Sequence, residues 1–129
     1  MGLKRSVNLE IALKVKPVDI NRLVQKIFEF VVLGVDSKWQ SLEFLYRADS
    51  NQSGYFGSYN IVEAQKYFDP TALSSEELSE LEDLLETLRN ETKEISGEPF
   101  THCKLLFESN GDFKIEYGYD PVDWSVRTG

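Results

Sequence analysis

The sequence predicts an α+β fold, with a mainly antiparallel sheet of about five strands and two helices packed on one face. Two observations predict it: several segments alternate apolar and polar residues with a period of two, and only two segments repeat apolar residues every three or four positions. Taken along the chain, these segments give the order β-α-β-β-α-β-β. The 129 residues form a single predicted domain, 1–129, with residues 1–5 and 120–129 as flexible or covering tails.

The first two elements are a strand and a helix. Apolar residues alternate with polar ones over residues 7–15, which is typical of a half-buried strand, and Pro17 ends it. Asp19 is then placed to cap a helix, and Gly34 is placed to end it. The apolar stripe of this helix consists of Ile20, Leu23, Val24, Ile27, Phe28 and Val31.

A hairpin is predicted next. Leu42, Phe44 and Tyr46 share one face of its first strand, and alternation resumes over residues 55–61 after the polar stretch 49–54. Residues 63–73 show neither period, and Pro70 after Asp69 favours a turn. We therefore expect a loop over residues 63–73.

The second helix carries clear signals at both ends. Ser74 and Glu77 form a capping box, and Gly97 followed by Pro99 marks the end. An apolar seam runs along this helix through Leu78, Leu81, Leu85, Leu88 and Ile95, and its other side is strongly acidic. That acidic side is either a solvated surface or a contact surface.

The last hairpin has a register that the pattern decides. A two-residue turn at Asn110 and Gly111 would place the apolar sets of the two strands on opposite faces. A three-residue loop over residues 109–111, with Gly111 left-handed, instead pairs Phe107 with Phe113 and brings the apolar sets together. The same register pairs Leu105 with Ile115 and Cys103 with Tyr117.

Charge is distributed unevenly along the chain. Residues 1–70 carry a net charge of +1 and residues 71–129 carry −9, within a total of −8. An acidic excess repels phosphate, so direct nucleic-acid binding is not expected, whereas a basic protein partner fits. The acidity also serves solubility in its own right. The longest strictly apolar run is four residues, too short to span a membrane, and the sequence is typical of a cytoplasmic protein.

Catalytic and metal-binding patterns are sparse. The single histidine, His102, and the single cysteine, Cys103, are adjacent on a predicted strand, so their side chains leave opposite faces and cannot form a nucleophile pair. Nucleotide-binding, metalloprotease and serine-hydrolase motifs are absent from the sequence, and no cofactor or metal is expected. The remaining enzymatic alternative is catalysis by a pair of carboxylates. We nevertheless expect that the protein is not an enzyme.

Acidic and aromatic residues interleave near the carboxyl end. Such a mixture suits docking onto a basic protein, because aromatic rings supply contact area and carboxylates pair with Arg or Lys. The alternative is that Tyr117 and Tyr119 belong to the core and that Trp124 covers a sheet edge. The candidate contact residues are Glu108, Glu116, Tyr117, Tyr119, Asp120, Asp123 and Trp124, with the helix residues Glu80, Asp83 and Glu86 in reserve.

A family resemblance rests on two motifs in this region. Residues 98–101 read EPFT and residues 111–120 read GDFKIEYGYD, separated by a predicted strand. This resembles the carboxyl-terminal signature of the YezG-like immunity proteins, roughly EPWT, a strand, then GxFxIxYxYD. The likeness covers residues 18–120 approximately, and it departs at Phe100, where the family tends to have Trp, and at the additional strand over residues 7–15.

The resemblance implies an antitoxin that binds a cognate bacterial toxin domain, in most cases a nuclease, without catalysis. Such proteins belong to polymorphic and contact-dependent toxin systems, and the partner is the carboxyl-terminal domain of the toxin. This agrees with the charge distribution, since nucleases are basic where they hold phosphate. The alternative is an adaptor or regulatory module that binds another basic protein. Neither the oligomeric state nor the toxin's substrate follows from the sequence.

Overall fold

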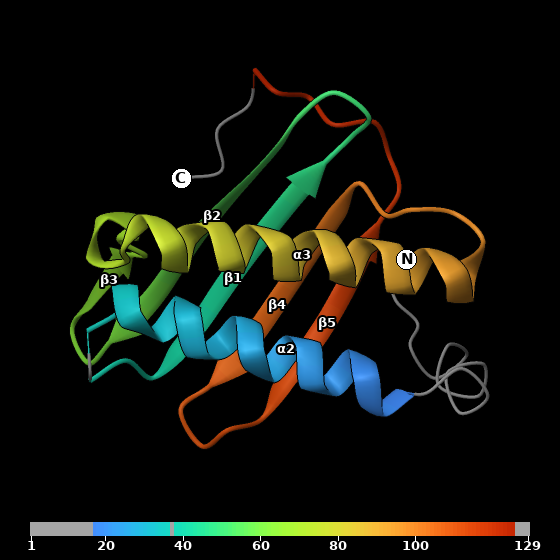
Figure 1. Ribbon diagram of the computed structural model, residues 1–129. Coiled ribbons are helices and arrows are strands. Elements are labelled where there is room, and N and C mark those ends of the chain that lie inside the picture. The colour runs from blue at the N-terminus through green and yellow to red at the C-terminus, as the bar shows by residue number, and fades with distance from the viewer. Residues whose placement is uncertain (1–16, 37, 126–129) are drawn as a thin grey trace. The chain divides into compact units, whose positions relative to one another are not determined.

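The computed structural model describes residues 17–36 and 38–125, and within them the chain has two α-helices and five antiparallel strands (Figure 1). The element order over this part is α-β-β-β-α-β-β, so the α+β class is confirmed and the predicted order is wrong. The predicted strand over residues 7–15 lies outside the described residues, and a third strand follows the first hairpin. The chain divides into two compact units, a sheet unit of residues 35–68 and 100–125 and a helical unit of residues 17–34 and 69–99.

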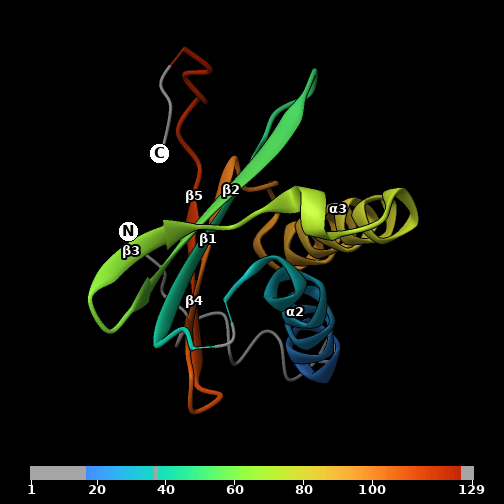
Figure 2. The ribbon, with the colours of Figure 1, turned by 90° about the vertical axis from the view of Figure 1, so that its left-hand side faces the viewer.

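The sheet unit is one antiparallel sheet with the strand order β3-β2-β1-β4-β5 (Figure 1). Strand β1 lies at its centre, with β2 on one side and β4 on the other. The strands fan out in Figure 2, as the usual twist of antiparallel sheets requires. Their bounds are Ser41–Ala48 for β1, Ser53–Ile61 for β2, Ala64–Tyr67 for β3, His102–Glu108 for β4 and Phe113–Gly118 for β5.

Both predicted hairpins are present, and the predicted register of the second is confirmed. Phe107 pairs with Phe113, and Gly111 in the loop has φ +101°, the left-handed region that glycine favours. The pairs Leu105 with Ile115 and Cys103 with Tyr117 follow from the same register. In the first hairpin, alternate residues of β1 are buried, as the pattern predicts.

Strand β3 corrects the expectation of a loop over residues 63–73. It pairs with the end of β2, and all four of its residues are exposed. Its side chains therefore carry no alternation of burial, which is why the sequence pattern did not reveal it; main-chain pairing with β2 holds it instead. A short 3-10 helix, Pro70–Ala72, follows, and Asp69 caps it by accepting from the N–H of Thr71.

Aromatic side chains on the buried face form the centre of the sheet unit. Phe44 on β1 is fully buried and contacts Tyr55 on β2 and Phe68, with ring centroids 5.5 Å apart in each pair. Gly57 lies opposite Phe44 in the register, and a Cβ there would lie only 2.8 Å from the Cβ of Phe68. The missing side chain of Gly57 is therefore what admits the Phe68 ring.

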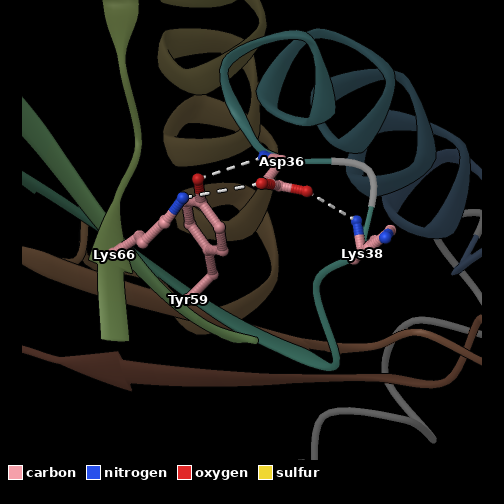
Figure 3. A network of polar contacts seen from close by, with 4 residues as sticks. All are labelled: Asp36, Lys38, Tyr59 and Lys66. Atoms are coloured by element: carbon pink, nitrogen blue, oxygen red, sulfur yellow. Dashed lines mark hydrogen bonds and ion pairs between the residues drawn. The ribbon is translucent and has the colours of Figure 1, made fainter. Parts of the chain in front are cut away.

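A polar network fixes the segment that leads into β1 (Figure 3). The backbone N–H of Asp36 donates to the hydroxyl oxygen of Tyr59, whose side chain is otherwise buried. The Asp36 carboxylate accepts from the backbone N–H of Lys38 and lies 3.6 Å from the Nζ atom of Lys66 on β3. The contacts of the carboxylate with Lys38 and Lys66 lower the pKa of Asp36, with the backbone bond from Lys38 as the largest cause.

The helical unit consists of α2, Pro17–Val31, and α3, Ser75–Ser96, which run in opposite directions (Figure 1) and contact each other. Helix α2 starts at Pro17, so the cap predicted at Asp19 is wrong, because Asp19 lies two residues inside the helix. Proline suits the first helical turn because its missing N–H has no partner there anyway. A short 3-10 helix, Val32–Gly34, ends it near the predicted glycine.

Helix α3 has the predicted ends. Ser74 and Glu77 make both bonds of the capping box, and Gly97 at φ +90° closes the carboxyl end. The buried seam consists of Leu81, Leu85, Leu88 and Thr92, and the Thr92 hydroxyl donates to the carbonyl of Leu88. No helix in the described part of the chain is both long and apolar enough to cross a membrane.

Candidate binding surfaces

The sheet has one face of buried side chains and one face of exposed or half-buried ones. Leu42, Phe44 and Tyr46 of β1 lie on the buried face, so residues 43, 45 and 47 lie on the other, which we call the exposed face. The registers assign the remaining positions. The exposed face carries Ser41, Glu43, Leu45 and Arg47 from β1, Gly54, Phe56, Ser58 and Asn60 from β2, Gln65 and Tyr67 from β3, His102, Lys104, Leu106 and Glu108 from β4, and Lys114, Glu116 and Gly118 from β5.

Two predicted contact residues, Glu108 and Glu116, lie on this exposed face. Glu116 pairs with Lys104 in the register, and the Lys104 Nζ atom lies 4.0 Å from the Glu116 carboxylate and 3.7 Å from that of Glu43. Lys104 is thus held between two carboxylates from neighbouring strands. The three side chains form a charge ladder with a net charge of −1.

Tyr117 belongs to the opposite face. It is half-buried, its ring stacks on that of Phe100 with centroids 5.6 Å apart, and Phe100 is fully buried. Because side chains alternate along a strand, Tyr117 and Glu116 leave β5 in opposite directions. The structure therefore separates two residues that the sequence grouped together.

Trp124 is joined to the loop between β1 and β2. Its indole N–H donates to the Asp49 carboxylate at 2.7 Å, and the Arg47 guanidinium carbon lies 5.0 Å from the centre of its ring. A Cβ on Gly54 would lie 3.7 Å from the ring, which places Trp124 over the exposed face at its β1–β2 end. Trp124 is half-buried by these contacts.

The residues beside Trp124 bring further carboxylates to the same end of the sheet unit. Asp123 is exposed, and the Ser125 hydroxyl and backbone N–H donate to its carboxylate, which lowers its pKa and keeps it charged. Asp120 is exposed as well, and Tyr119 is 38% exposed. Asp120, Asp123 and Tyr119 are therefore available to a partner.

Thr101 and His102 hold the start of this segment. The Thr101 hydroxyl donates to the backbone carbonyl of Asp120 and lies 2.9 Å from Nδ1 of His102. The pKa of His102 is lowered, first because burial disfavours the charged ring and then because Arg47 is close, while Asp120 acts in the opposite direction. His102 is thus predominantly neutral at pH 7.

The reserve residues lie on helix α3, in the other unit. Glu80 and Asp83 lie on one face of this helix, in a stripe that contains no Lys or Arg. The stripe consists of residues 76, 80, 83, 87, 91 and 94. Glu86 lies on the flank of this stripe, three residues before Arg89. A shallow hollow of about 460 Å³ lies along the stripe, lined by Glu76, Ser79, Glu80, Asp83, Leu84 and Thr87.

The structure keeps apart the two side chains that the sequence placed next to each other as a possible nucleophile pair. His102 and Cys103 point to opposite faces of the sheet, and Cys103 is fully buried, which raises its pKa and keeps it a thiol. Groups of three or more side chains suited to hold a metal ion do not occur among residues 17–36 and 38–125.

Sequence reasoning missed the apolar residues of the exposed face. Leu45, Phe56, Tyr67 and Leu106 come from four strands, and only the registers bring them together. The sequence did contain a signal for two of them. Leu45 and Leu106 stand between residues predicted to be buried, at places in the alternation where polar residues are usual.

Comparison with known protein families identifies the class of the protein. The model of the family described as immunity protein YezG-like matches residues 20–127, which is most of the chain. The chain belongs to this family of immunity proteins, and so to a class whose members are not enzymes. The comparison with curated proteins gives no match.

Proposed function

We propose that this protein neutralises a cognate toxin of nuclease type by binding its toxin domain through acidic and aromatic residues of the sheet unit. Membership of the immunity family supports binding to a toxin. The observation that supports this particular surface is the gathering of carboxylates around Trp124. Asp49, Asp120 and Asp123 lie near one end of the exposed face, and Glu108 and Glu116 lie on it.

A nuclease supplies the complementary charge. Its phosphate-binding groove is basic, and an acidic partner that approaches it associates quickly and in a salt-dependent way. Two of the cations on the exposed face are already engaged within the protein, Lys104 by carboxylates and Arg47 by the Trp124 ring. The net charge still favours a basic partner: this face and its β1–β2 end carry six carboxylates, of Glu43, Glu108, Glu116, Asp49, Asp120 and Asp123, against the three cations of Arg47, Lys104 and Lys114.

Co-expression with the toxin domain encoded immediately upstream tests the proposal. We expect growth to be rescued and a complex to co-purify, with an affinity that falls as the salt concentration rises. Failure of rescue together with absence of a complex would contradict the immunity role and favour an adaptor that binds another basic protein. Rescue with an affinity independent of salt would contradict the electrostatic mode.

Charge reversal then locates the surface. Glu116→Lys combined with Asp123→Lys should weaken the complex at least tenfold if the sheet unit binds the toxin, because two favourable charge contacts become repulsive. Glu63→Lys is the matched control, since Glu63 is an exposed acid in the turn between β2 and β3. The set Glu80→Lys, Asp83→Lys and Glu86→Lys tests helix α3. Loss of binding by this second set alone would move the proposed contact to the helical unit.

A further inference from the structure

An apolar band crosses the exposed face of the sheet. Leu45 on β1 stands directly opposite Phe56 on β2, and the Phe56 ring lies 5.6 Å from the ring of Tyr67 on β3. Leu106 on β4 pairs with Glu43 and lies on the same face, on the far side of the Glu43–Lys104 ion pair from Leu45. We call Tyr67, Phe56, Leu45 and Leu106 the apolar band.

The band remains accessible in the structure. Tyr67 is 51% exposed, and Leu45, Phe56 and Leu106 are half-buried, whereas the apolar residues of β1 and β4 on the other face are buried. An antiparallel sheet with one exposed face usually carries polar side chains there. Tyr67, Phe56 and Leu45 follow one another across such a face, and Leu106 lies beyond the Glu43–Lys104 ion pair. Large apolar side chains gathered on an exposed face are a feature of protein interaction sites.

Carboxylates border this band. The Glu43–Lys104–Glu116 ladder, with a net charge of −1, runs from β1 across β4 to β5 and passes between Leu45 and Leu106, and Asp123 lies beside Trp124 at the β1–β2 end. An apolar centre with an acidic border complements a partner surface in which aliphatic or aromatic residues project between Arg or Lys side chains.

We propose that the apolar band is the anchoring centre of the toxin-binding surface and receives an apolar projection of the toxin domain flanked by basic residues. This inference rests on the proposed function and names the residues that carry most of the affinity. The carboxylates around the band then set orientation and association rate, while the band determines how long the complex lasts.

The test is affinity for the upstream-encoded toxin domain, with the full chain carrying Leu45→Thr and Phe56→Thr. Threonine keeps the preference for strand structure and removes most of the apolar area. We expect the affinity to fall about thirtyfold, mainly through faster dissociation. The loss should persist at high salt, where the effect of charge reversal fades. Val62→Thr is the matched control, because Val62 is 76% exposed but lies in the turn between β2 and β3, outside the band.

The outcomes separate this inference from the proposed function. If the unmodified protein neither binds nor neutralises the toxin, the proposed function fails. If the unmodified protein binds and the folded double variant, checked by circular dichroism and thermal unfolding, binds within threefold of it, the band is not the anchor. In the second case the immunity role stands.

Two further measurements examine other occupants of the band. A dimer seen by light scattering that the double variant converts to monomer would assign the band to a second copy of the chain. Hydroxyl-radical labelling should modify Tyr67 and Phe56 readily in the free protein and weakly in the complex. Equal protection in both states would mean that the chain itself covers the band. Either of these results would overturn the proposal.

Discussion

Trp124 donates its indole N–H to the Oδ2 atom of Asp49, a residue 75 positions earlier in the chain, at 2.7 Å. The other oxygen of the same carboxylate accepts the backbone N–H groups of Asn51 and Gln52, which close the turn between β1 and β2. One carboxylate thus both shapes a turn and anchors the segment that follows β5. We expect the position of Trp124 on the exposed face to depend on this bond.

Trp124→Phe should release that segment. The ring remains apolar but loses its donor, and a hydrogen bond to a charged acceptor contributes about 1.5–3 kcal/mol when its partner is protected from water. We expect faster hydrogen exchange of the amides of residues 122–125, with little change in exchange within β1. Asp49→Asn is the comparison variant, because it keeps an acceptor and should change exchange less. Equal exchange rates in the unmodified protein and Trp124→Phe would contradict the anchoring role.

Gly57→Ala should destabilise the sheet unit by about 1–3 kcal/mol. The new Cβ would lie 2.8 Å from the Cβ of Phe68, an atom next to the backbone that cannot swing away, and 3.2 Å from the Phe44 ring. The control is Gly54→Ala on the same strand, whose Cβ would lie at an ordinary 3.7 Å from Trp124. Urea unfolding measures both. A loss below 0.5 kcal/mol at position 57, the size usual for surface changes, would show that Phe68 moves aside.

Ser74→Ala removes one half of the capping box of α3. The Ser74 side chain accepts from the N–H of Glu77, and loss of such a cap costs about 1 kcal/mol. Ser79→Ala lies on the exposed surface of the same helix and should be neutral or slightly stabilising, because alanine has the higher helix propensity. Thermal unfolding of the two variants side by side provides the measurement. Equal melting temperatures would contradict the role of the cap.

The lowered pKa of His102 makes stability depend on pH. Below its ordinary pKa of 6.5 the unfolded chain binds a proton that the folded protein accepts only at lower pH, so stability is full above pH 6.5 and falls as pH decreases towards the folded pKa. His102→Asn removes this titration. As the pH falls from 7.5 to 5, the free energy of unfolding of the unmodified protein should therefore decrease more than that of His102→Asn. A difference that is constant over this range would contradict the lowered pKa.

Local sequence signals were sufficient for the hairpins and for α3. The register of β4 and β5 followed from the need to place both apolar sets on one face, and the ends of α3 followed from Ser74 and Gly97. Strand β3 escaped prediction because its four residues are all exposed and carry no period. The start of α2 was misplaced because Pro17 fits both the end of a strand and the first turn of a helix.

The candidate surface was only partly accessible to sequence reasoning. The acidic excess and the position of Trp124 were visible, and they led to Glu116, Asp120 and Asp123. The predicted set of contact residues does not share one face, because side chains alternate along β5 and Tyr117 lies on the face opposite to that of Glu116. The ladder partner Glu43 was not selected, since it lies 73 positions from Glu116 in the sequence.

The sequence by itself determined which segments form strands in the two hairpins, how α3 begins and ends, the acidity of the second half, and the family to which the chain belongs. These properties depend on periodicity, capping and motifs, which involve residues close together in the chain. Only the tertiary structure decided which residues share the exposed face, because the pairing of β1 with both β2 and β4 joins Leu45 to Phe56 and Lys104. Such neighbours come from distant segments, and hydrogen bonding between strands, rather than any local pattern, sets their alignment.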